Sequence, residues 1–278
     1  MYCTMDEQDL GGIGKLSRAR LAEVIRHFKG CFNASDVSDC LQITKAKARG
    51  MLALWSKRGW LQRIRPGVYL PVEFAAESSN DVIADPWVVA TQLYPPCYIG
   101  GWSACEFWGF TDQIFSSIVV LTAKRVNGKE QMAGNMTFLI KKQDSEKMFG
   151  LKTVWKDSIK VQVSDPHKTI IDLLDDPSLG GGIRSLADML QKYFQSEHLN
   201  ASTLLEYADQ MKNKTIFKRL GYLLSVLKPS ETSLIDHCKE RISQGNSQID
   251  PSSKGNRLIK KWRLWLPEDF ENTLQPTK

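Results

Sequence analysis

Apolar residues recur at helical spacing near the start of the chain. From Leu16 to Phe28 they fall three or four positions apart, with charged residues between them, which predicts an amphipathic helix. A shorter helix is expected over residues 36–41 with Ser35 as its cap, because a serine hydroxyl accepts hydrogen bonds from the free N–H groups of a first helical turn. This part of the chain therefore predicts two helices in close succession.

A third helix is predicted from Thr44 to about Arg58, where Gly59 ends it. Its inward stripe would consist of Ala48, Met51, Leu52 and Trp55. Its opposite side carries three small residues, Ala46, Gly50 and Ala53. The cations Lys47, Arg49 and Lys57 flank them. Such a strip lets a helix backbone approach a flat or grooved partner closely, although packing against another helix would explain it as well.

A basic hairpin is predicted next. Residues 60–64 and 68–70 read as two short strands, and Pro66-Gly67 supplies the turn between them. Arg63 and Arg65 place positive charge at its tip. Three helices followed by such a hairpin is the pattern of a winged helix-turn-helix domain, in which the third helix enters the DNA major groove and the hairpin lies on the flanking backbone.

The whole chain is predicted to have an α+β fold with two domains. Residues 1–80 would form the winged helix-turn-helix domain with its linker, and residues 81–278 a C-terminal domain. Within the latter, residues 81–164 read as mixed α/β, and residues 165–278 as mainly helical with a terminal strand over 257–267. Gly100-Gly101, before a helix capped by Ser103, predicts close packing of a strand against a helix, because no phosphate-loop pattern surrounds the pair.

Charge is concentrated at one end of the chain. The net charge is +6, and residues 15–70 hold twelve Lys and Arg against three Asp and Glu. Such a module is typical of a protein that binds a phosphate backbone, although a solvated basic face would look the same. The predicted contacts with double-stranded DNA are Thr44, Lys45, Lys47, Arg49, Lys57, Arg63 and Arg65.

The remaining composition suggests a cytoplasmic protein without a cofactor. There is no run of eighteen apolar residues, and the first ten residues are acidic, so neither a membrane span nor a signal peptide is expected. The six cysteines lack metal-binding spacing and are expected to be reduced, so we expect no metal site.

The densest titratable cluster is predicted to be structural rather than catalytic. Asp172, Asp175 and Asp176 lie near His167 and Lys168 in the sequence. Lys168 and Asp172 are four positions apart, which predicts a salt-bridged helix face. No nucleophile, metal set or phosphate loop accompanies the cluster, so we do not expect an enzyme.

Four segments, taken in order, resemble the AbiEi family, the antitoxins and autorepressors of type IV abortive-infection toxin–antitoxin systems. They are LWSKRGWLQRIRPGVYLP (54–71), YIGGWSACEFWGFTDQ (98–113), DPHKTIIDLL (165–174) and KKWRLWLP (260–267). The resemblance implies that the N-terminal domain binds inverted repeats in its own promoter, with possible self-association on DNA. It also implies that the C-terminal domain counters a nucleotidyltransferase-like toxin without a stable complex.

For that second activity we predict a surface of exposed cations in the helical part, namely Lys168, Arg184, Lys214, Lys218 and Arg219. Two other classes of function stay open on the sequence. One is an accessory or enzymatic nucleic-acid-processing protein that uses the winged helix for docking. The other is an RNA-directed or protein-interaction module.

Overall fold

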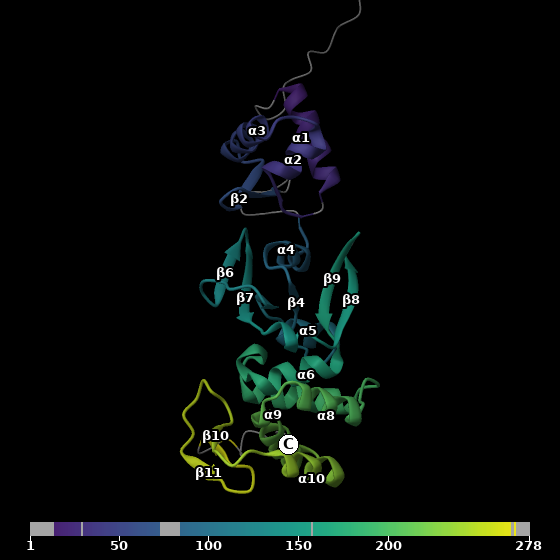
Figure 1. The fold of residues 1–278 in the computed structure, drawn as a ribbon, viewed down its shortest axis with the longest axis vertical. Coiled ribbons are helices and arrows are strands. Elements are labelled where there is room, and N and C mark those ends of the chain that lie inside the picture. Colours follow the sequence, from purple (N-terminus) through teal and green to yellow (C-terminus); the bar gives the residue numbers. More distant parts are fainter. Residues whose placement is uncertain (1–13, 29, 73–83, 157, 268–269, 271–278) are drawn as a thin grey trace, which may run out of the picture. The chain divides into compact units, whose positions relative to one another are not determined.

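The computed structural model describes residues 14–28, 30–72, 84–156, 158–267 and 270 (Figure 1). The chain divides into two compact units. The first comprises Met1–Leu93, Glu130–Phe138 and Trp155–Lys160, and the second comprises Tyr94–Lys129, Leu139–Val154 and Val161–Lys278. Most of the linker expected after Pro71 lies outside the described residues.

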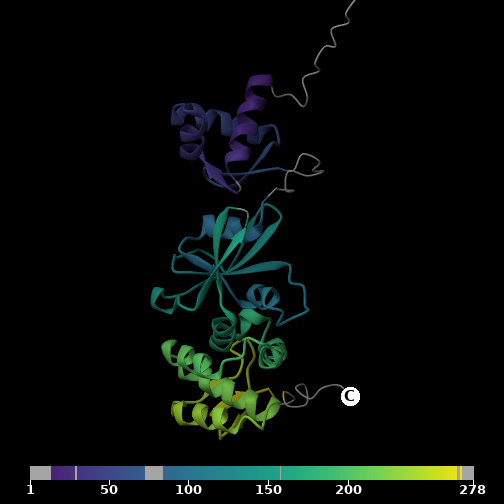
Figure 2. The same cartoon turned by 90° about the vertical axis from the view of Figure 1, so that its right-hand side faces the viewer.

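The first unit begins with three helices and a small sheet. Its elements are α1 (Lys15–His27), β1 (Phe32–Asn33), α2 (Ala34–Leu41), α3 (Lys45–Lys57), β2 (Leu61–Arg65), β3 (Val68–Pro71) and, further on, α4 (Pro86–Leu93). The sheet has the order β1-β3-β2 with antiparallel pairs, and its neighbouring helices are the purple and blue ribbons of Figure 2. The three predicted helices and the hairpin are confirmed. Strand β1 was not predicted, because two residues give no periodicity.

The helices and the small sheet share one core because each contributes one apolar side. Leu21 and Val24 of α1, Val37 of α2 and Leu52 and Trp55 of α3 are all buried. Trp55 also donates from its indole N–H to the hydroxyl of Ser17, 2.9 Å away. The predicted inward stripe of α3 is thus confirmed, except that Met51 is only half-buried.

A six-stranded mixed sheet follows, with the order β6-β7-β5-β4-β9-β8. Its strands are β4 (Cys97–Ile99), β5 (Ser117–Thr122), β6 (Glu130–Ala133), β7 (Met136–Lys142), β8 (Leu151–Lys156) and β9 (Ile159–Ser164). β4 pairs antiparallel with β5 and parallel with β9. Together with α4 and α5 (Gly101–Phe107), these strands confirm the mixed α/β character predicted for residues 81–164.

Close packing explains the two glycines before helix α5 (Gly101–Phe107). A Cβ on Gly100 would lie 2.4 Å from Leu121 of β5, and a Cβ on Gly101 would lie 2.5 Å from the Leu179 carbonyl. The packing interpretation of this pair is therefore confirmed. The predicted cap is wrong: the Ser103 hydroxyl accepts a hydrogen bond from Val119 N at 3.0 Å instead.

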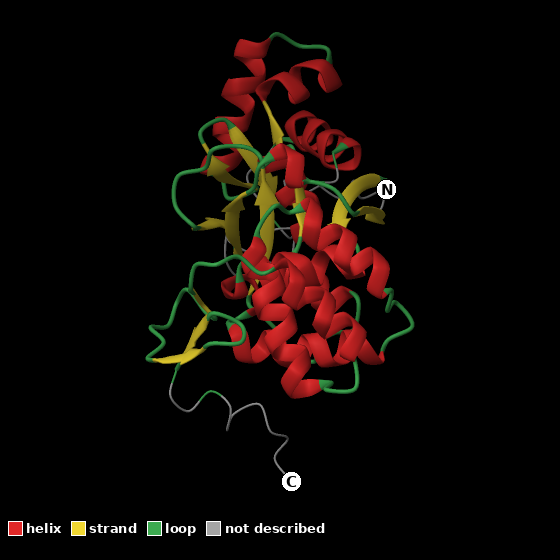
Figure 3. Ribbon diagram, turned by 60° about the horizontal axis from the view of Figure 1, so that its bottom comes forward, coloured by secondary structure: helices red, strands yellow, loops and turns green. Residues whose placement is uncertain are grey.

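The second unit contains a cluster of helices, drawn in red in Figure 3. They are α6 (Pro166–Asp175), α7 (Ile183–Gln195), α8 (Ala201–Gln210), α9 (Lys214–Leu227) and α10 (Thr232–Arg241). Their buried faces form one core with residues of α5 and β5. The helical character predicted for this region is confirmed.

The last segment forms a small sheet rather than the single strand predicted over 257–267. Its strands are β10 (Ser247–Gln248), β11 (Arg257–Ile259) and β12 (Leu264–Leu266), in the order β10-β12-β11. The chain reverses at residues 260–263 so that β11 and β12 pair antiparallel. The prediction failed because the buried Trp262, which looks like a strand residue, lies in the turn.

Candidate nucleic-acid interface

Helix α3 presents a basic and small-residue face to solvent. The Thr44 hydroxyl caps it by accepting from Lys47 N at 3.3 Å. Ala46, Gly50 and Ala53 are exposed, and a Cβ built on Gly50 meets no atom within 4 Å. The alternative explanation, that this strip packs against another helix of the chain, therefore finds no support within the described residues.

Helix α2 begins with a capping box that the sequence prediction missed. The Asn33 side chain accepts from Ser35 N at 2.7 Å and from Asp36 N at 3.3 Å, while the Asp36 carboxylate accepts from Asn33 N at 2.7 Å. The cap is thus Asn33 and not Ser35. The sequence signal for the Asn33 cap is Asp36 three residues later, because a capping box needs a side-chain acceptor at the N-cap and another three residues after it.

A hollow of about 390 Å³ lies between the start of α2, helix α3 and the hairpin. It is lined by Asn33, Ala34, Ser35, Lys45, Arg49, Leu52, Arg63, Gly67 and Tyr69. Gly67 has φ +78°, the left-handed conformation that turns the chain between β2 and β3. The hollow therefore combines three cations from two different elements with the N-terminal end of a third.

No anion among the described residues satisfies these three cations. Lys45, Arg49 and Arg63 are exposed, and none of them forms an ion pair or hydrogen bond with another described side chain. At the N-terminal end of α2, the Asn33 side chain already accepts from two N–H groups and Asp36 lies in the first turn, so the positive charge of the hollow comes from the three side chains. The hollow is thus a concave surface of positive potential, suited to a phosphate group or another small anion.

The other predicted DNA contacts occupy different positions. Lys47 and Lys57 are exposed on α3 and do not line the hollow. Arg65 is half-buried, and its guanidinium donates to the Leu93 carbonyl at 3.4 Å and to Oε1 of Gln131. Arg65 is therefore occupied within the first unit and does not share the open cationic face with Arg63.

Three cations of the predicted antitoxin surface are not on the surface. Lys168, Lys218 and Arg219 are buried, whereas Arg184 and Lys214 are exposed. The prediction was wrong for the first three because a helical pattern with cations at intervals does not show which of them face other elements. Lysine and arginine are usually solvated, so their presence on an amphipathic helix predicts exposure unless another element packs over them.

The buried Lys168 forms the predicted i, i+4 ion pair with Asp172, and both side chains are fully buried. The Tyr98 hydroxyl donates to Oδ2 of Asp172 at 2.9 Å, and the Lys168 ammonium lies 3.2 Å from the Tyr98 hydroxyl. Burial raises the pKa of Asp172 above its ordinary value, and the charge of Lys168 offsets part of that effect. The pair is an internal element of the core rather than a salt-bridged surface.

Lys218 and Arg219 attach the C-terminal sheet to helix α9. Lys218 donates to the Gly245 carbonyl and to the Ser247 hydroxyl. Arg219 donates to the carbonyls of Ile249 at 2.8 Å and of Leu174 at 2.7 Å, and also to those of Gln248 and Asp175. Burial lowers the pKa of both groups, so their carbonyl partners compensate for lost hydration.

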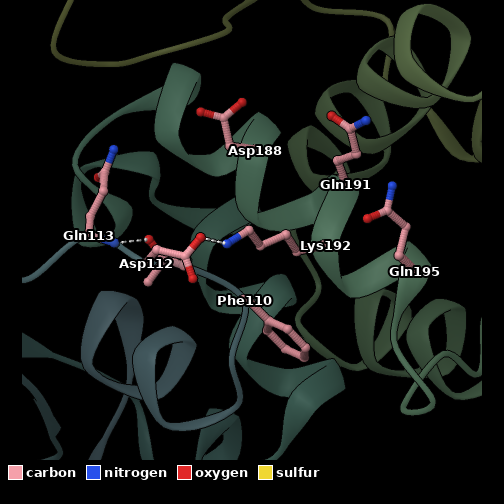
Figure 4. Close-up of a pocket in the computed structure, with 8 residues that line it drawn as sticks. Phe110, Asp112, Gln113, Asp188, Gln191, Lys192 and Gln195 are labelled. Carbon is pink, nitrogen blue, oxygen red and sulfur yellow. Dashed lines mark hydrogen bonds and ion pairs between the residues drawn. The ribbon is translucent and has the colours of Figure 1, made fainter. Parts of the chain in front are cut away.

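A second pocket, of about 490 Å³, lies in the second unit between the loop after α5 and one side of α7. Its lining is mostly polar, with Asp188, Gln191 and Gln195 from α7 and an ion pair between Asp112 and Lys192, whose side chains point toward each other in Figure 4. Burial raises the pKa of Asp188 above its ordinary value. These groups can hydrogen-bond a polar partner. Unlike the hollow beside α3, which is lined by three cations, this pocket contains both acidic and basic side chains.

No known family profile matches the chain. Among solved structures, the fold is similar to the crystal structure of the RV2827C protein from Mycobacterium tuberculosis, with a TM-score of 0.65, 13% identity and 93% of each chain covered. Such a TM-score over most of both chains shows a shared fold. At this identity it says nothing about activity.

A sequence similarity relates part of the chain to myohemerythrin from Sipunculus nudus. It is 30% identical over 110 residues, which is 37% of this chain and 91% of that protein. Myohemerythrin is an up-down-up-down four-helix bundle, whereas the described part of this chain combines ten α-helices with three sheets. Within that part, no group of three or more His, Cys, Asp or Glu side chains is placed to hold a metal ion.

No helix among the described residues has the length and apolarity that crossing a membrane requires.

Proposed function

We propose that the chain is a sequence-specific DNA-binding protein that represses its own operon, with an N-terminal winged helix-turn-helix domain. The order α1-β1-α2-α3-β2-β3 with a β1-β3-β2 sheet supports this assignment, since a winged helix combines three helices with a hairpin in that way. In this proposal α3 is the recognition helix and the β2-β3 hairpin is the wing. The partner is double-stranded DNA.

The observation that carries the proposal is the hollow with its three unpaired cations. Lys45 and Arg49 from α3 and Arg63 from β2 converge without a carboxylate partner among the described residues. Keeping like charges together costs electrostatic free energy unless an anion binds between them. A DNA phosphate provides that anion, and its contacts fix the register of the recognition helix on the duplex.

The exposed strip of α3 supplies the second part of the proposal. Because nothing in the described chain approaches Gly50, the backbone of α3 at this point is open to an external surface. In the major groove, a helix reads base edges with side chains beside such a strip. Lys47 and Arg49, which flank it, are the proposed base-reading candidates.

An antitoxin role for the second unit rests on the resemblance to the AbiEi family. It would counter a nucleotidyltransferase-like toxin without forming a stable complex. Arg184 and Lys214 remain the candidates for the surface involved, since the other three predicted cations are buried. Binding to inverted repeats in the promoter would bring two copies of the chain together on DNA.

A gel shift with the DNA upstream of the gene, compared with random duplex and structured RNA, tests the repressor proposal. Preference for the upstream duplex supports it. Equal binding to both duplexes points instead to a protein that docks on nucleic acid for another purpose, and preference for RNA points to an RNA-directed module. Co-expression with a downstream nucleotidyltransferase-like gene tests the antitoxin role, because the chain should then restore growth.

A further inference from the structure

The turn between β11 and β12 presents cations on a fixed support. Residues 260–263 read Lys-Lys-Trp-Arg, and Trp262 points inward with only 1% of its surface exposed, whereas Lys260, Lys261 and Arg263 are exposed. Trp262 packs against Gly221 of α9 so closely that a Cβ on that glycine would lie 2.1 Å from the indole ring. The tryptophan therefore fixes the turn. Lys260 and Lys261 are exposed beside it, with the Lys261 ammonium 5.6 Å from the centre of the Trp262 ring, whereas the Arg263 guanidinium donates to the Gln244 carbonyl.

Further contacts hold the small sheet in place. Ser247 N donates to the Arg263 carbonyl and Ile249 N to the Trp265 carbonyl, both at 3.0 Å. Lys218 and Arg219 of α9 bind carbonyl groups in and beside β10. The turn is thus presented by a supported sheet and not by a free loop.

The positive charge of the turn has no acidic partner among the described residues. Residues 251–267 contain Lys254, Arg257, Lys260, Lys261 and Arg263 and no Asp or Glu. Lys254, Lys260 and Lys261 form no ion pair with another described residue. Residues 71–278 carry as many basic as acidic residues, and acidic residues flank this basic segment in the sequence, at Asp250 before it and at Glu268 and Asp269 after it.

We propose that the turn Lys260–Arg263 is a second contact site for nucleic-acid phosphates, independent of base sequence; this rests on the proposed DNA-binding function. Interfaces with proteins are enriched in aromatic and apolar residues and depleted in lysine. None of the large exposed hydrophobic side chains of the described chain belongs to residues 239–267. Lysines on a rigid turn without an apolar neighbour on the surface fit a phosphate backbone, whose recognition is electrostatic.

The test uses the full-length chain with the proposed α3 interface disabled by Lys47→Gln, Arg49→Gln and Arg63→Gln. Binding to random duplex is measured by fluorescence anisotropy at several salt concentrations. Adding Lys260→Gln and Lys261→Gln should weaken the remaining binding about three- to tenfold and flatten the plot of log affinity against log salt by about 0.9 for each phosphate that these lysines no longer neutralise. The control replaces two exposed lysines of β8 and β9, Lys152→Gln and Lys160→Gln, and should have a smaller effect.

In the otherwise unaltered chain, the turn variants should weaken operator and random duplex by the same factor, because phosphate contacts carry no sequence information. Equal effects of the turn pair and the control pair overturn the inference. So does polyglutamate that competes better than duplex at equal charge, since an acidic protein would then be the better partner. If the unaltered chain binds no DNA at all, the proposed function fails as well; if it binds operator but the turn pair has no effect, only this inference fails.

Discussion

Arg49 of helix α3 and Arg63 of strand β2 line the same hollow, and neither has an acidic partner among the described residues. The sequence places these two guanidinium groups on different elements, and the fold brings them together beside the start of α2. An anion that binds the chain is therefore expected between them. The effect on DNA binding of substituting each residue can be predicted separately.

Arg63→Gln should reduce the salt dependence of DNA binding. If Arg63 contacts one phosphate, the slope of log affinity against log salt should become less steep by about 0.9, and operator and random duplex should weaken together. The free energy of unfolding should stay the same or rise slightly, because the substitution removes a like-charge neighbour. Anisotropy titrations and thermal unfolding measure both effects, with exposed Arg184→Gln of the second unit as the matched control; an unchanged slope would contradict a phosphate contact.

Arg49→Ala should weaken operator binding by about 1–3 kcal/mol and relax preference at one base pair, if Arg49 reads a guanine as proposed. The measurement is affinity for a set of operators with single base-pair changes. Because Arg49 also lines the hollow, it could contact a phosphate instead of a base, and affinities for the same operators distinguish the two contacts. Uniform weakening across all of them would assign Arg49 to the phosphate, and the same series with Lys47→Ala would then identify Lys47 as the base-reading residue.

Substitutions at Gly50 should separate stability from binding. Gly50→Ala should raise the free energy of unfolding by about 0.5–1 kcal/mol, because alanine restricts the unfolded chain and the site has free space around a Cβ. Gly50→Gln should also keep the fold stable, but its side chain should block close approach of DNA and lower affinity. The matched control is Ser56→Gln, at a half-buried position of the same helix; normal operator binding by folded Gly50→Gln would show that DNA does not approach this strip.

Arg65→Gln should behave in the opposite way to Arg63→Gln. Its guanidinium binds the Leu93 carbonyl and Gln131 within the first unit, so its loss should destabilise the fold by about 1 kcal/mol, the net value of a partly exposed hydrogen-bonded group. The salt slope of DNA binding should remain that of the unaltered chain. A flatter slope with unchanged stability would place Arg65 on the DNA instead.

Lys168→Met should be strongly destabilising, because it leaves the Asp172 carboxylate buried without its counter-charge. Breaking a buried pair from one side typically costs about 3–5 kcal/mol. Replacing both partners, Lys168→Met with Asp172→Leu, should recover much of this loss, although Tyr98 then loses its acceptor. Denaturant unfolding of the single and double variants measures the difference, and equal destabilisation by both would show that the pair does not act as a unit.

The sequence by itself determined the local elements and the location of charge. Helical spacing specified α1 and α3, Pro66-Gly67 specified the hairpin turn, and paired glycines specified close packing at the start of α5. These succeeded because each depends on neighbouring residues, through periodicity, backbone conformation or the absence of a side chain. The basic character of residues 15–70 was equally visible, since charge is a property of composition.

Only the tertiary structure decided which side chains face outward and which converge. Lys168, Lys218 and Arg219 look like Arg184 and Lys214 in the sequence, yet the first three are buried and bind partners far along the chain. The hollow joins Arg49 to Arg63, and the turn at Trp262 breaks an apparent strand, through packing against other elements. A single sequence carries no direct record of such long-range contacts, so burial, and with it the role of each cation, is fixed only when the elements pack together.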